Sequence, residues 1–289
     1  MNFNFFTFGG RFLWEDVFNY QNWTIQCNIR NQKYRLLDSH NIRRASGTFN
    51  ECKNTLLKYI EAYELNPIYD DTVILLHNFC CTKHCWKNIT DSLQPLNANI
   101  IAVNYASLYK DLSHHAHLLV QFLRNLNNKG KLYFITSGAG CLVLRKLLAT
   151  CENYRAYHIA NVLDINPINS GSDLADLVYT NRLCQKVFGP MLTDLIPQKA
   201  ISLAKIPQEI PHGIIFYAPS YTQLVKKMLS HFESFPPLSP PSESSYADKI
   251  CTVKKYKMFP LNDKELGEIC LYYLQNGEFP KLPENKNTD

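Results

Sequence analysis

The sequence predicts an α/β fold with a mostly parallel, doubly wound sheet, an N-terminal antiparallel hairpin and an irregular cap. Two observations lead to this fold class. Short apolar runs alternate with segments of helical periodicity, which is typical of parallel strands joined by crossover helices. The runs are apolar without alternation, as expected for strands covered on both faces. The six runs are 72–76, 100–103, 132–135, 159–165, 214–217 and 250–253.

The composition limits the class of protein. Of the 289 residues, 46% are hydrophobic, which is enough for an extended core. The net charge of +5 is spread without a block of like charges, and this disfavours nucleic-acid binding. No apolar run approaches the roughly 18 residues of a transmembrane helix, and no signal peptide is recognisable at the start. We expect a cytoplasmic protein with mostly reduced cysteines; export by a non-classical route stays open.

The first predicted element is a hairpin at 20–37. Apolar and polar side chains alternate over 23–29, which is the period of a half-buried strand. The polar residues 30–32 suit a turn into a second strand at 34–37. This hairpin is expected to add antiparallel strands at one edge of the sheet.

A helix is predicted at 49–63. Thr48 can cap its N-terminus, and Glu51 occupies the capping-box position three residues later. The side chains expected to face inward are Leu56, Leu57 and Ile60.

Further helices are predicted between the apolar runs. A helix-like segment at 86–96 follows the first run, and a clear 3.6-residue stripe covers 112–126. Apolar residues at 142–148 indicate a helix after the third run, and a closing helix is expected at 264–275.

The centre of the pattern is the segment 131–149. A buried strand runs through a glycine-containing turn into a helix, which is the geometry of a nucleophile elbow with the motif G-x-S-x-G. The serine of that motif lies at the apex of the turn. Here the five residues run from Thr136 to Gly140, and the apex falls on Gly138.

Three stretches interrupt the alternation. Residues 166–212 are long for a crossover and mix glycine, proline and serine with short apolar pieces, as a cap or lid would. Residues 234–246 contain four prolines and predict a stiff, exposed loop. We expect one domain at 1–279 and a disordered tail at 280–289.

Five motifs, in order and spacing, resemble bacterial lipase/esterase-like α/β-hydrolases of the triacylglycerol-lipase type. Residues 73–78 look like the strand that ends in His-Gly before the oxyanion loop, and 103–107 are similar to the next strand end. Residues 134–143 align with the strand, T-H-S-x-G-G turn and helix, and 166–172 resemble the P-P-N-x-G-S segment. Residues 264–279 are similar to the closing helix. The resemblance implies an α/β-hydrolase fold and positions for a Ser–Asp–His triad.

The nucleophile and histidine positions depart from this family. Gly138 keeps the strained turn but has no hydroxyl group. Ser137 is the alternative nucleophile, although the residue before the apex commonly faces away from the pocket. The histidine is expected in 254–264, which contains none. His231 lies upstream of the last strand, where a solvated or capping role is expected.

The acid and oxyanion positions are also altered. Asp248 resembles the acid-bearing segment of the family, and an isolated surface aspartate is an equal alternative. The oxyanion loop glycine after His77 is replaced by Asn78, and Phe79 and Ala139 complete the expected oxyanion pocket. Loss of one oxyanion donor can cost about 100- to 1,000-fold in rate. Together these departures predict a fold that is kept without its hydrolytic chemistry.

Cysteines and histidines suggest two other sites. The segment 80–85 invites a zinc or redox site, but its spacing does not match paired ligand motifs, and partly buried thiols are the alternative. Its candidate residues are Cys80, Cys81, His84 and Cys85. A histidine-rich stretch beside the apolar stripe is expected to be a solvated helix face. These histidines are His114, His115 and His117.

The function expected from the sequence is that of a catalytically inactive lipase/esterase-like protein, which binds a hydrophobic acyl-type ligand or a protein partner. One alternative is an active serine esterase or lipase that uses Ser137 with a non-standard base. A second is a Cys/His metal or redox site between Cys80 and Cys85. We expect no cofactor, no resident metal, no nucleic-acid partner and no transmembrane segment.

Overall fold

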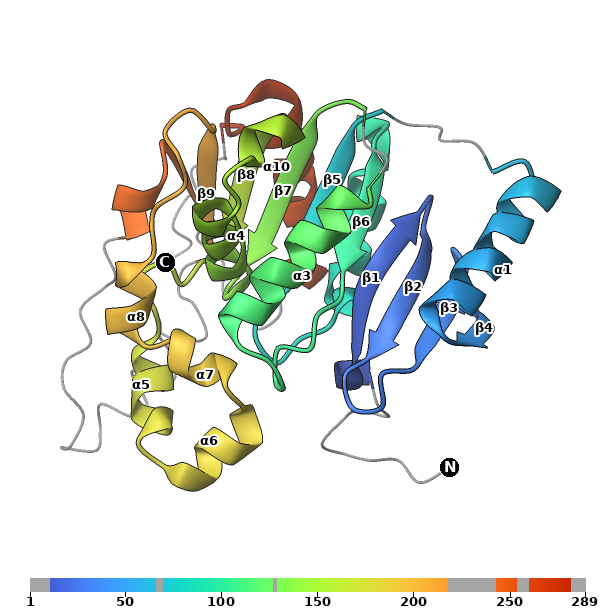
Figure 1. Cartoon of the computed structure of the whole chain (residues 1–289). Helices are drawn as coiled ribbons and strands as arrows, with labels where there is room; N and C mark the ends of the chain where they lie inside the picture. The colour runs from blue at the N-terminus through green and yellow to red at the C-terminus, as the bar shows by residue number, and fades with distance from the viewer. Residues whose placement is uncertain (1–10, 66–69, 127–128, 218–242, 254–259, 282–289) are drawn as a thin grey trace.

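The computed structural model describes residues 11–65, 70–126, 129–217, 243–253 and 260–281. Its frame is a six-stranded sheet in the order β10-β9-β8-β7-β5-β6, with every neighbouring pair parallel (Figure 1). All six predicted strands are confirmed, with ends that differ by at most two residues. The strands are β5 (Thr72–Leu76), β6 (Asn99–Val103), β7 (Leu132–Ser137), β8 (Ile159–Ile165), β9 (His212–Tyr217) and β10 (Lys249–Val253).

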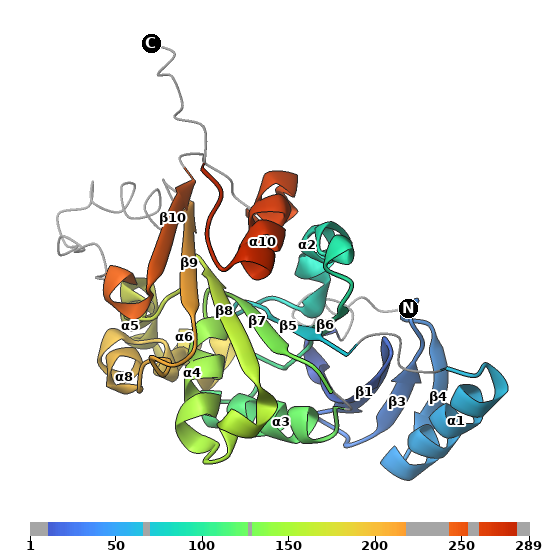
Figure 2. The same ribbon diagram turned by 90° about the horizontal axis from the view of Figure 1, so that it is seen from above.

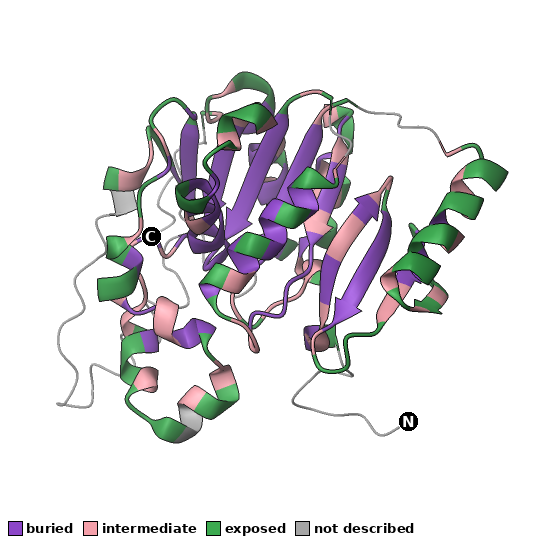
Figure 3. Cartoon of the chain, viewed as in Figure 1, coloured by how far each residue is buried: buried purple, intermediate pink, exposed green. Residues whose placement is uncertain are grey.

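Helices cover both faces of this sheet, as its continuous apolar strands require. On one face, α3 (Leu112–Arg124) and α4 (Gly140–Thr150) pack against strand residues such as Ile101 and Phe134. On the other face lie α2 (Lys87–Ser92) and α10 (Lys264–Asn276) (Figure 2), which pack against strand residues such as Ile100 and Ile135. The inner strands β5, β7, β8 and β9 are largely buried (Figure 3), whereas three of the five residues of the edge strand β10 are exposed. Short 3-10 helices occur at Lys83–Trp86, Gln94–Leu96, Tyr154–Tyr157, Glu243–Tyr246 and Pro260–Asn262.

The predicted hairpin belongs to a separate four-stranded antiparallel sheet with the order β1-β2-β3-β4. The hairpin itself is the β2–β3 pair, and the outer strands β1 and β4 were not predicted. The sheet meets the edge of the parallel sheet, because Asp16 N donates to Asn104 O at 2.8 Å just after β6. The elements are a 3-10 turn at Arg11–Leu13, β1 (Trp14–Tyr20), β2 (Trp23–Asn28), β3 (Tyr34–Leu37) and β4 (Arg43–Gly47).

Helix α1 (Phe49–Ala62) covers the N-terminal sheet. The predicted capping box is confirmed: Thr48 accepts from Glu51 N, and Glu51 accepts from Thr48 N at 2.7 Å. Leu56 is buried against the sheet, whereas Leu57 is 52% exposed, so its predicted inward position is wrong. The next residue on a helix turns by about 100°, which carries Leu57 off the packed face.

The region predicted as a cap contains four short helices near the carboxyl ends of the parallel strands (Figure 1). They are α5 (Asp173–Tyr179), α6 (Arg182–Phe188), α7 (Met191–Asp194) and α8 (Pro197–Ser202). The proline-rich loop predicted at 234–246 lies outside the described residues up to 242, and the predicted tail lies outside them from 282 onward. Among the described helices, none has the length and apolar character needed to cross a membrane.

Candidate functional site

The turn between β7 and α4 has the backbone of a nucleophile elbow. Gly138 lies at its apex with φ +51°, a left-handed conformation that glycine adopts without a steric cost. Its N–H donates to Ile165 O at 3.1 Å, which fixes the turn to β8. Gly140 lets α4 approach β5, because a Cβ there would lie 2.5 Å from Leu76 O. The sequence prediction of a sharp turn centred on Gly138 is therefore met by the structure.

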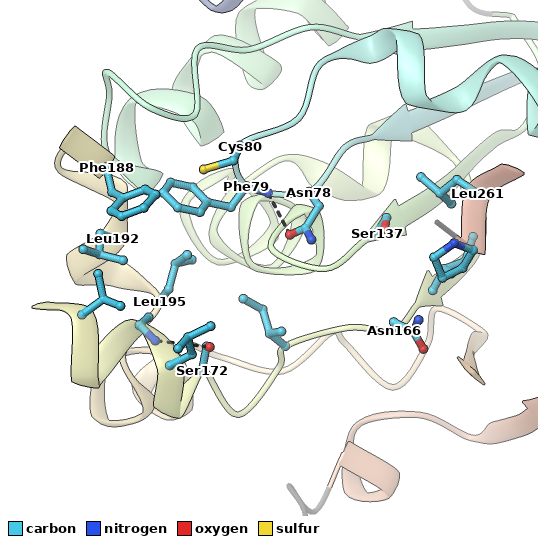
Figure 4. Close-up of a pocket in the computed structure, with 16 residues that line it drawn as sticks. Asn78, Phe79, Cys80, Ser137, Asn166, Ser172, Phe188, Leu192, Leu195 and Leu261 are labelled. Carbon is cyan, nitrogen blue, oxygen red and sulfur yellow. Dashed lines mark hydrogen bonds between the residues drawn. The ribbon is translucent and has the colours of Figure 1, made fainter. Parts of the chain in front are cut away.

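The side chain of Asn78 occupies the space beside this apex. Its Oδ1 accepts a hydrogen bond from Phe79 N at 2.8 Å (Figure 4). The same oxygen accepts from Ala139 N, also at 2.8 Å. A Cβ on Gly138 would lie 2.1 Å from the same oxygen. The N–H of the residue after the apex and an N–H from the loop after a neighbouring strand, here β5, are the donors of an oxyanion hole in this type of site. In this protein both donors are already satisfied by an internal carboxamide oxygen.

A cavity of about 430 Å³ opens beside the turn, within the range of small-molecule sites. Asn78, Phe79 and Ser137 line it from the parallel sheet, and residues of α5 to α7 line it from the cap. The rings of Phe79 and Phe188 lie 6.2 Å apart, so an aromatic contact joins the loop after β5 to the cap (Figure 4). The pocket therefore lies between the predicted turn and the predicted cap.

Most of the pocket lining is apolar, and its polar members are neutral. Asn166 Oδ1 accepts from Tyr217 N at 2.8 Å, and Ser172 Oγ accepts from Ala175 N as the N-cap of α5. The described lining contains neither a carboxylate nor a basic side chain. Such a surface suits an uncharged ligand, because an ion buried there would have no partner of opposite charge.

Ser137 faces the pocket, contrary to the expectation that the residue before the apex turns away from it. Its neighbour Thr136 points to the other face of β7, since successive residues of a strand alternate. Ser137 is 8% exposed. None of the histidines that the structure describes lines the pocket or hydrogen bonds to Ser137. The alternative nucleophile is thus present, without a described imidazole to activate it.

His77 holds the loop that carries Asn78. Its Nδ1 donates to Asn78 O at 2.8 Å and its Nε2 accepts from Tyr105 N at 3.3 Å. The Tyr105 ring stacks on the imidazole with centroids 3.9 Å apart, and its hydroxyl donates to His77 O. Burial lowers the pKa of His77 to about 4. The side chain is therefore a neutral spacer that fixes the loop, and both ring nitrogens are engaged.

Asp248, the expected acid, is not brought to the turn. It directly precedes β10, and its N–H donates to His212 O at 3.0 Å. A residue before a parallel strand lies at the amino edge of the sheet, whereas Gly138 and the pocket lie at the carboxyl edge. Of the predicted site residues, the structure gathers Gly138, Ser137, Ala139, Asn78 and Phe79 and leaves Asp248 at the opposite end.

A buried polar network that the sequence reading missed lies behind the turn. Thr136 Oγ1 donates to Asp164 Oδ1 at 2.6 Å, and His212 Nε2 lies 2.9 Å from Asp164 Oδ2. His212 Nδ1 donates to Tyr246 O at 2.7 Å. Burial lowers the pKa of His212, but the Asp164 carboxylate and these hydrogen bonds outweigh it, so its pKa is raised above the ordinary value. One signal was available: Asp164 is a charged residue within an apolar run.

Arg145, a residue of α4, joins this helix to the cap by hydrogen bonds. The guanidinium group is buried and donates to Asn169 O at 2.7 Å, Ala200 O at 3.1 Å and Ala204 O at 3.0 Å. Ala200 lies in the last turn of α8, where the carbonyl groups carry the partial negative charge of the helix C-terminus. The cap is thus anchored by a buried cation as well as by apolar contacts.

The segment 80–85 does not form a three-ligand group in the described part of the chain. Cys80 is exposed with φ +56°, whereas Cys81 and Cys85 are half-buried, and all three carry free thiols. A hydrogen bond from the Cys85 side chain lowers the pKa of Cys81. A redox role for the Cys81 and Cys85 thiols stays a prediction.

Comparison with solved structures identifies the fold. The chain is similar to the mature form of Bacillus licheniformis lipase BlEst2, with 14% identity and a TM-score of 0.54 over 73% of this chain and 92% of that chain. The propeptide form of that lipase gives 14% identity and a TM-score of 0.54, over 72% of this chain and 50% of that chain. A tomato methylketone synthase I variant complexed with β-ketoheptanoate is 14% identical, with a TM-score of 0.49, over 73% and 99% of the two chains.

No protein-family model matches the chain, and no curated protein matches its sequence. Structural likeness at this level of identity shows the fold alone. The architecture is an α/β-hydrolase fold, as the resemblance in the sequence implied.

Proposed function

We propose that this protein, which has a lipase/esterase-like α/β-hydrolase fold, does not hydrolyse esters and instead binds a neutral, acyl-type ligand in the pocket beside Gly138. One observation carries the proposal: Asn78 Oδ1 accepts from both N–H groups that would stabilise a substrate oxygen, Phe79 N and Ala139 N. The apex residue beside it has no side chain that could act as a nucleophile.

The occupied donors weigh against acyl transfer on energetic grounds. In an ester hydrolase, such N–H groups accelerate the reaction because they bind the developing negative charge more strongly than the ground state. Here a substrate oxygen would first have to displace Asn78 Oδ1, which two 2.8 Å hydrogen bonds hold in place. Loss of one donor alone costs about 100- to 1,000-fold in rate. The lack of an apex hydroxyl adds to this loss.

The chemistry of the pocket favours a neutral ligand with an apolar chain. Phe79, Ile168, Val178 and Leu192 offer apolar surface, while Ser137 and Asn166 lie near the turn. A free carboxylate would lose its hydration without gaining a described cationic partner. An ester or an alcohol loses less on burial. We therefore expect a monoacylglycerol to bind more tightly than the free fatty acid of the same chain length.

Calorimetric titration with these two ligands tests the proposed binding function. Val178→Trp should fill the pocket and weaken binding of the monoacylglycerol at least tenfold. Val187→Trp is the matched control, because Val187 lies in the same cap with 48% of its surface exposed and does not line the pocket. Absence of binding, or equal loss in both variants, contradicts a ligand site between the turn and the cap.

Labelling with a fluorophosphonate tests the proposed lack of catalysis. The position of Ser137 in the pocket lining favours one second candidate, an active esterase that uses this serine with a non-standard base. The expected result is no adduct on the native protein and no turnover of short-chain nitrophenyl esters. An adduct that maps to Ser137 and disappears in Ser137→Ala would establish the second candidate and overturn the first.

A further inference from the structure

Three potential ligand side chains meet where the N-terminal sheet contacts α3, away from the pocket. Glu15 projects from β1, and His114 and His115 lie in the first turn of α3. His114 Nε2 is 2.9 Å from Glu15 Oε2, and His115 Nδ1 is 3.8 Å from Glu15 Oε1. One ligand atom of each residue lies within 4.8 Å of the other two. The solvated helix face expected from the sequence is therefore wrong for His114 and His115, whereas His117 is exposed as expected.

His115 presents a buried nitrogen atom with nothing to bind. Its Nε2 contacts Lys110 O at 3.1 Å, and because a carbonyl only accepts, this nitrogen carries the proton. Nδ1 then has a free lone pair. It has no hydrogen-bond partner in the described structure, and the ring is 1% exposed. The atom that faces it at 3.8 Å is a carboxylate oxygen, also an acceptor. Two acceptors that face each other in a buried site repel one another, and a positive charge between them would remove this repulsion.

Contacts outside the cluster orient the carboxylate of Glu15 and the ring of His115. Ala106 N donates to Glu15 Oε1 at 3.3 Å, which holds the carboxylate, and the Lys110 carbonyl holds the tautomer of His115. Such outer contacts to the second nitrogen of an imidazole are typical of metal-ligating histidines. The His114 side chain is 39% exposed, so the cluster is open to solvent on that side. An ion could reach it there, and a water molecule could complete its coordination.

We propose that Glu15, His114 and His115 bind a divalent transition-metal ion of the Zn²⁺ class. Ligand atoms at about 2.0–2.2 Å from a tetrahedral ion lie about 3.3–3.6 Å from one another. The two histidine–Glu15 distances, one to each carboxylate oxygen, are 2.9 Å and 3.8 Å and lie on either side of this spacing. Two imidazoles with one carboxylate suit zinc, nickel or copper, whereas calcium and magnesium prefer oxygen ligands alone.

The metal would join β1 to α3 and so fasten the N-terminal sheet to the parallel sheet. None of the three residues lines the pocket beside Gly138. A result for or against the metal site therefore does not affect the proposed ligand-binding function. Because the bound ion would stabilise the folded chain and not the unfolded one, zinc should also raise the melting temperature.

The test is calorimetric titration of the full chain with ZnCl₂, together with elemental analysis after dialysis. We expect one equivalent of zinc and a loss of affinity of at least tenfold in both Glu15→Gln and His114→Gln. The matched control is His117→Gln on the same helix, where His117 Nε2 contacts Gln121 outside the cluster. His115 is left unchanged because substitution of a buried ring could unfold the chain.

Cobalt absorption separates this cluster from the cysteines. Co²⁺ bound by nitrogen and oxygen should show visible d–d bands without the near-ultraviolet charge-transfer band of a cobalt–thiolate bond. A thiolate band, affinity that is unchanged in Glu15→Gln and His114→Gln, or an equal loss in His117→Gln would overturn the proposal. Absence of saturable zinc binding would overturn it as well.

Discussion

Each face of strand β7 carries a hydroxyl group at the end of the strand, but the two hydroxyl groups have different surroundings. On one face, the Ser137 hydroxyl lines the pocket, with no described histidine beside it. On the other, the Thr136 hydroxyl donates to Asp164, which in turn pairs with His212 in the core. The first face has access to a ligand but no base among the described residues. The second has an imidazole and a carboxylate but no access to a ligand.

A hydroxyl group, an imidazole and a carboxylate in contact do not form a catalytic triad unless they also lie in the right spatial order. In a catalytic triad the imidazole lies between the hydroxyl and the carboxylate, so that it can take the proton of the hydroxyl. In this protein the carboxylate of Asp164 lies between Thr136 and His212, so the imidazole does not reach the hydroxyl. The buried groups therefore act as a structural ion pair, and we expect their effect on stability rather than on reaction rate.

Asp164→Ala should have the largest effect, a loss of about 3–5 kcal/mol in the free energy of unfolding. The change leaves His212 buried without its counter-ion and Thr136 without its acceptor. Urea denaturation measures it. Asp91→Ala on the exposed surface of α2 is the control and should change stability by less than about 0.5 kcal/mol. A loss below about 1 kcal/mol for Asp164→Ala would show that the network is not structural.

Gly138→Ala should lower the free energy of unfolding by about 2–3 kcal/mol, because the backbone there is left-handed and the added Cβ would clash with Asn78. Gly277→Ala separates the two causes, because Gly277 has φ +69° and nothing lies within 4 Å of an added Cβ. We expect the Gly277 variant to lose about 1–2 kcal/mol, from the backbone alone. The excess at Gly138 should disappear in the background of Asn78→Gly. Equal losses in both variants would mean that the carboxamide does not restrict the apex.

The pH dependence of stability should differ in sign between the two histidines. The pKa of His77 is lowered to about 4, so the unfolded chain binds a proton between pH 6.5 and 4 that the folded chain does not. Stability therefore falls as pH drops through this window, by at most about 1.4 kcal/mol per pH unit. The pKa of His212 is raised, so its contribution is complete below pH 6.5 and is lost as pH rises through its folded-state pKa.

Urea denaturation at a series of pH values, on the native chain and on His77→Gln, measures the loss of stability toward low pH (the acid limb) and toward high pH (the alkaline limb). The variant should make the acid limb less steep and leave the alkaline limb unchanged; buried His115, whose pKa is lowered to about 3, accounts for part of the slope that remains. If the acid limb is equally steep in the variant, other groups cause it and His77 is not held neutral.

Ser137→Ala should have the smallest effect, within about 0.5 kcal/mol of the native stability. The control on the opposite face of β7 is Thr136→Val, which removes a hydrogen bond to the Asp164 carboxylate and should cost about 1.5–3 kcal/mol. The same denaturation experiment compares the two variants. A larger loss for Ser137→Ala than for Thr136→Val would reverse the roles assigned to the two faces.

The fold was predictable where local pattern and burial agree. The six parallel strands are continuous apolar runs, and the start of α1 follows from Thr48 and Glu51 alone. Strand β1 was missed because it contains Glu15 and Asp16, charged residues that look like part of a loop. Both are buried, since Asp16 pairs with Lys83 at 3.3 Å and Glu15 lies against the histidines of α3.

The sequence by itself determined the turn at Gly138 and the lack of a histidine in 254–264, because backbone conformation and residue identity are local properties. Only the tertiary structure decided what fills the turn. Asn78 and Ala139 are 61 residues apart and meet because β5 and β7 are neighbours in the sheet. The same reason applies to the buried pair of Asp164 with His212 and to the cluster of Glu15 with His114 and His115. Each depends on which strands and helices lie side by side, and no local pattern records that order.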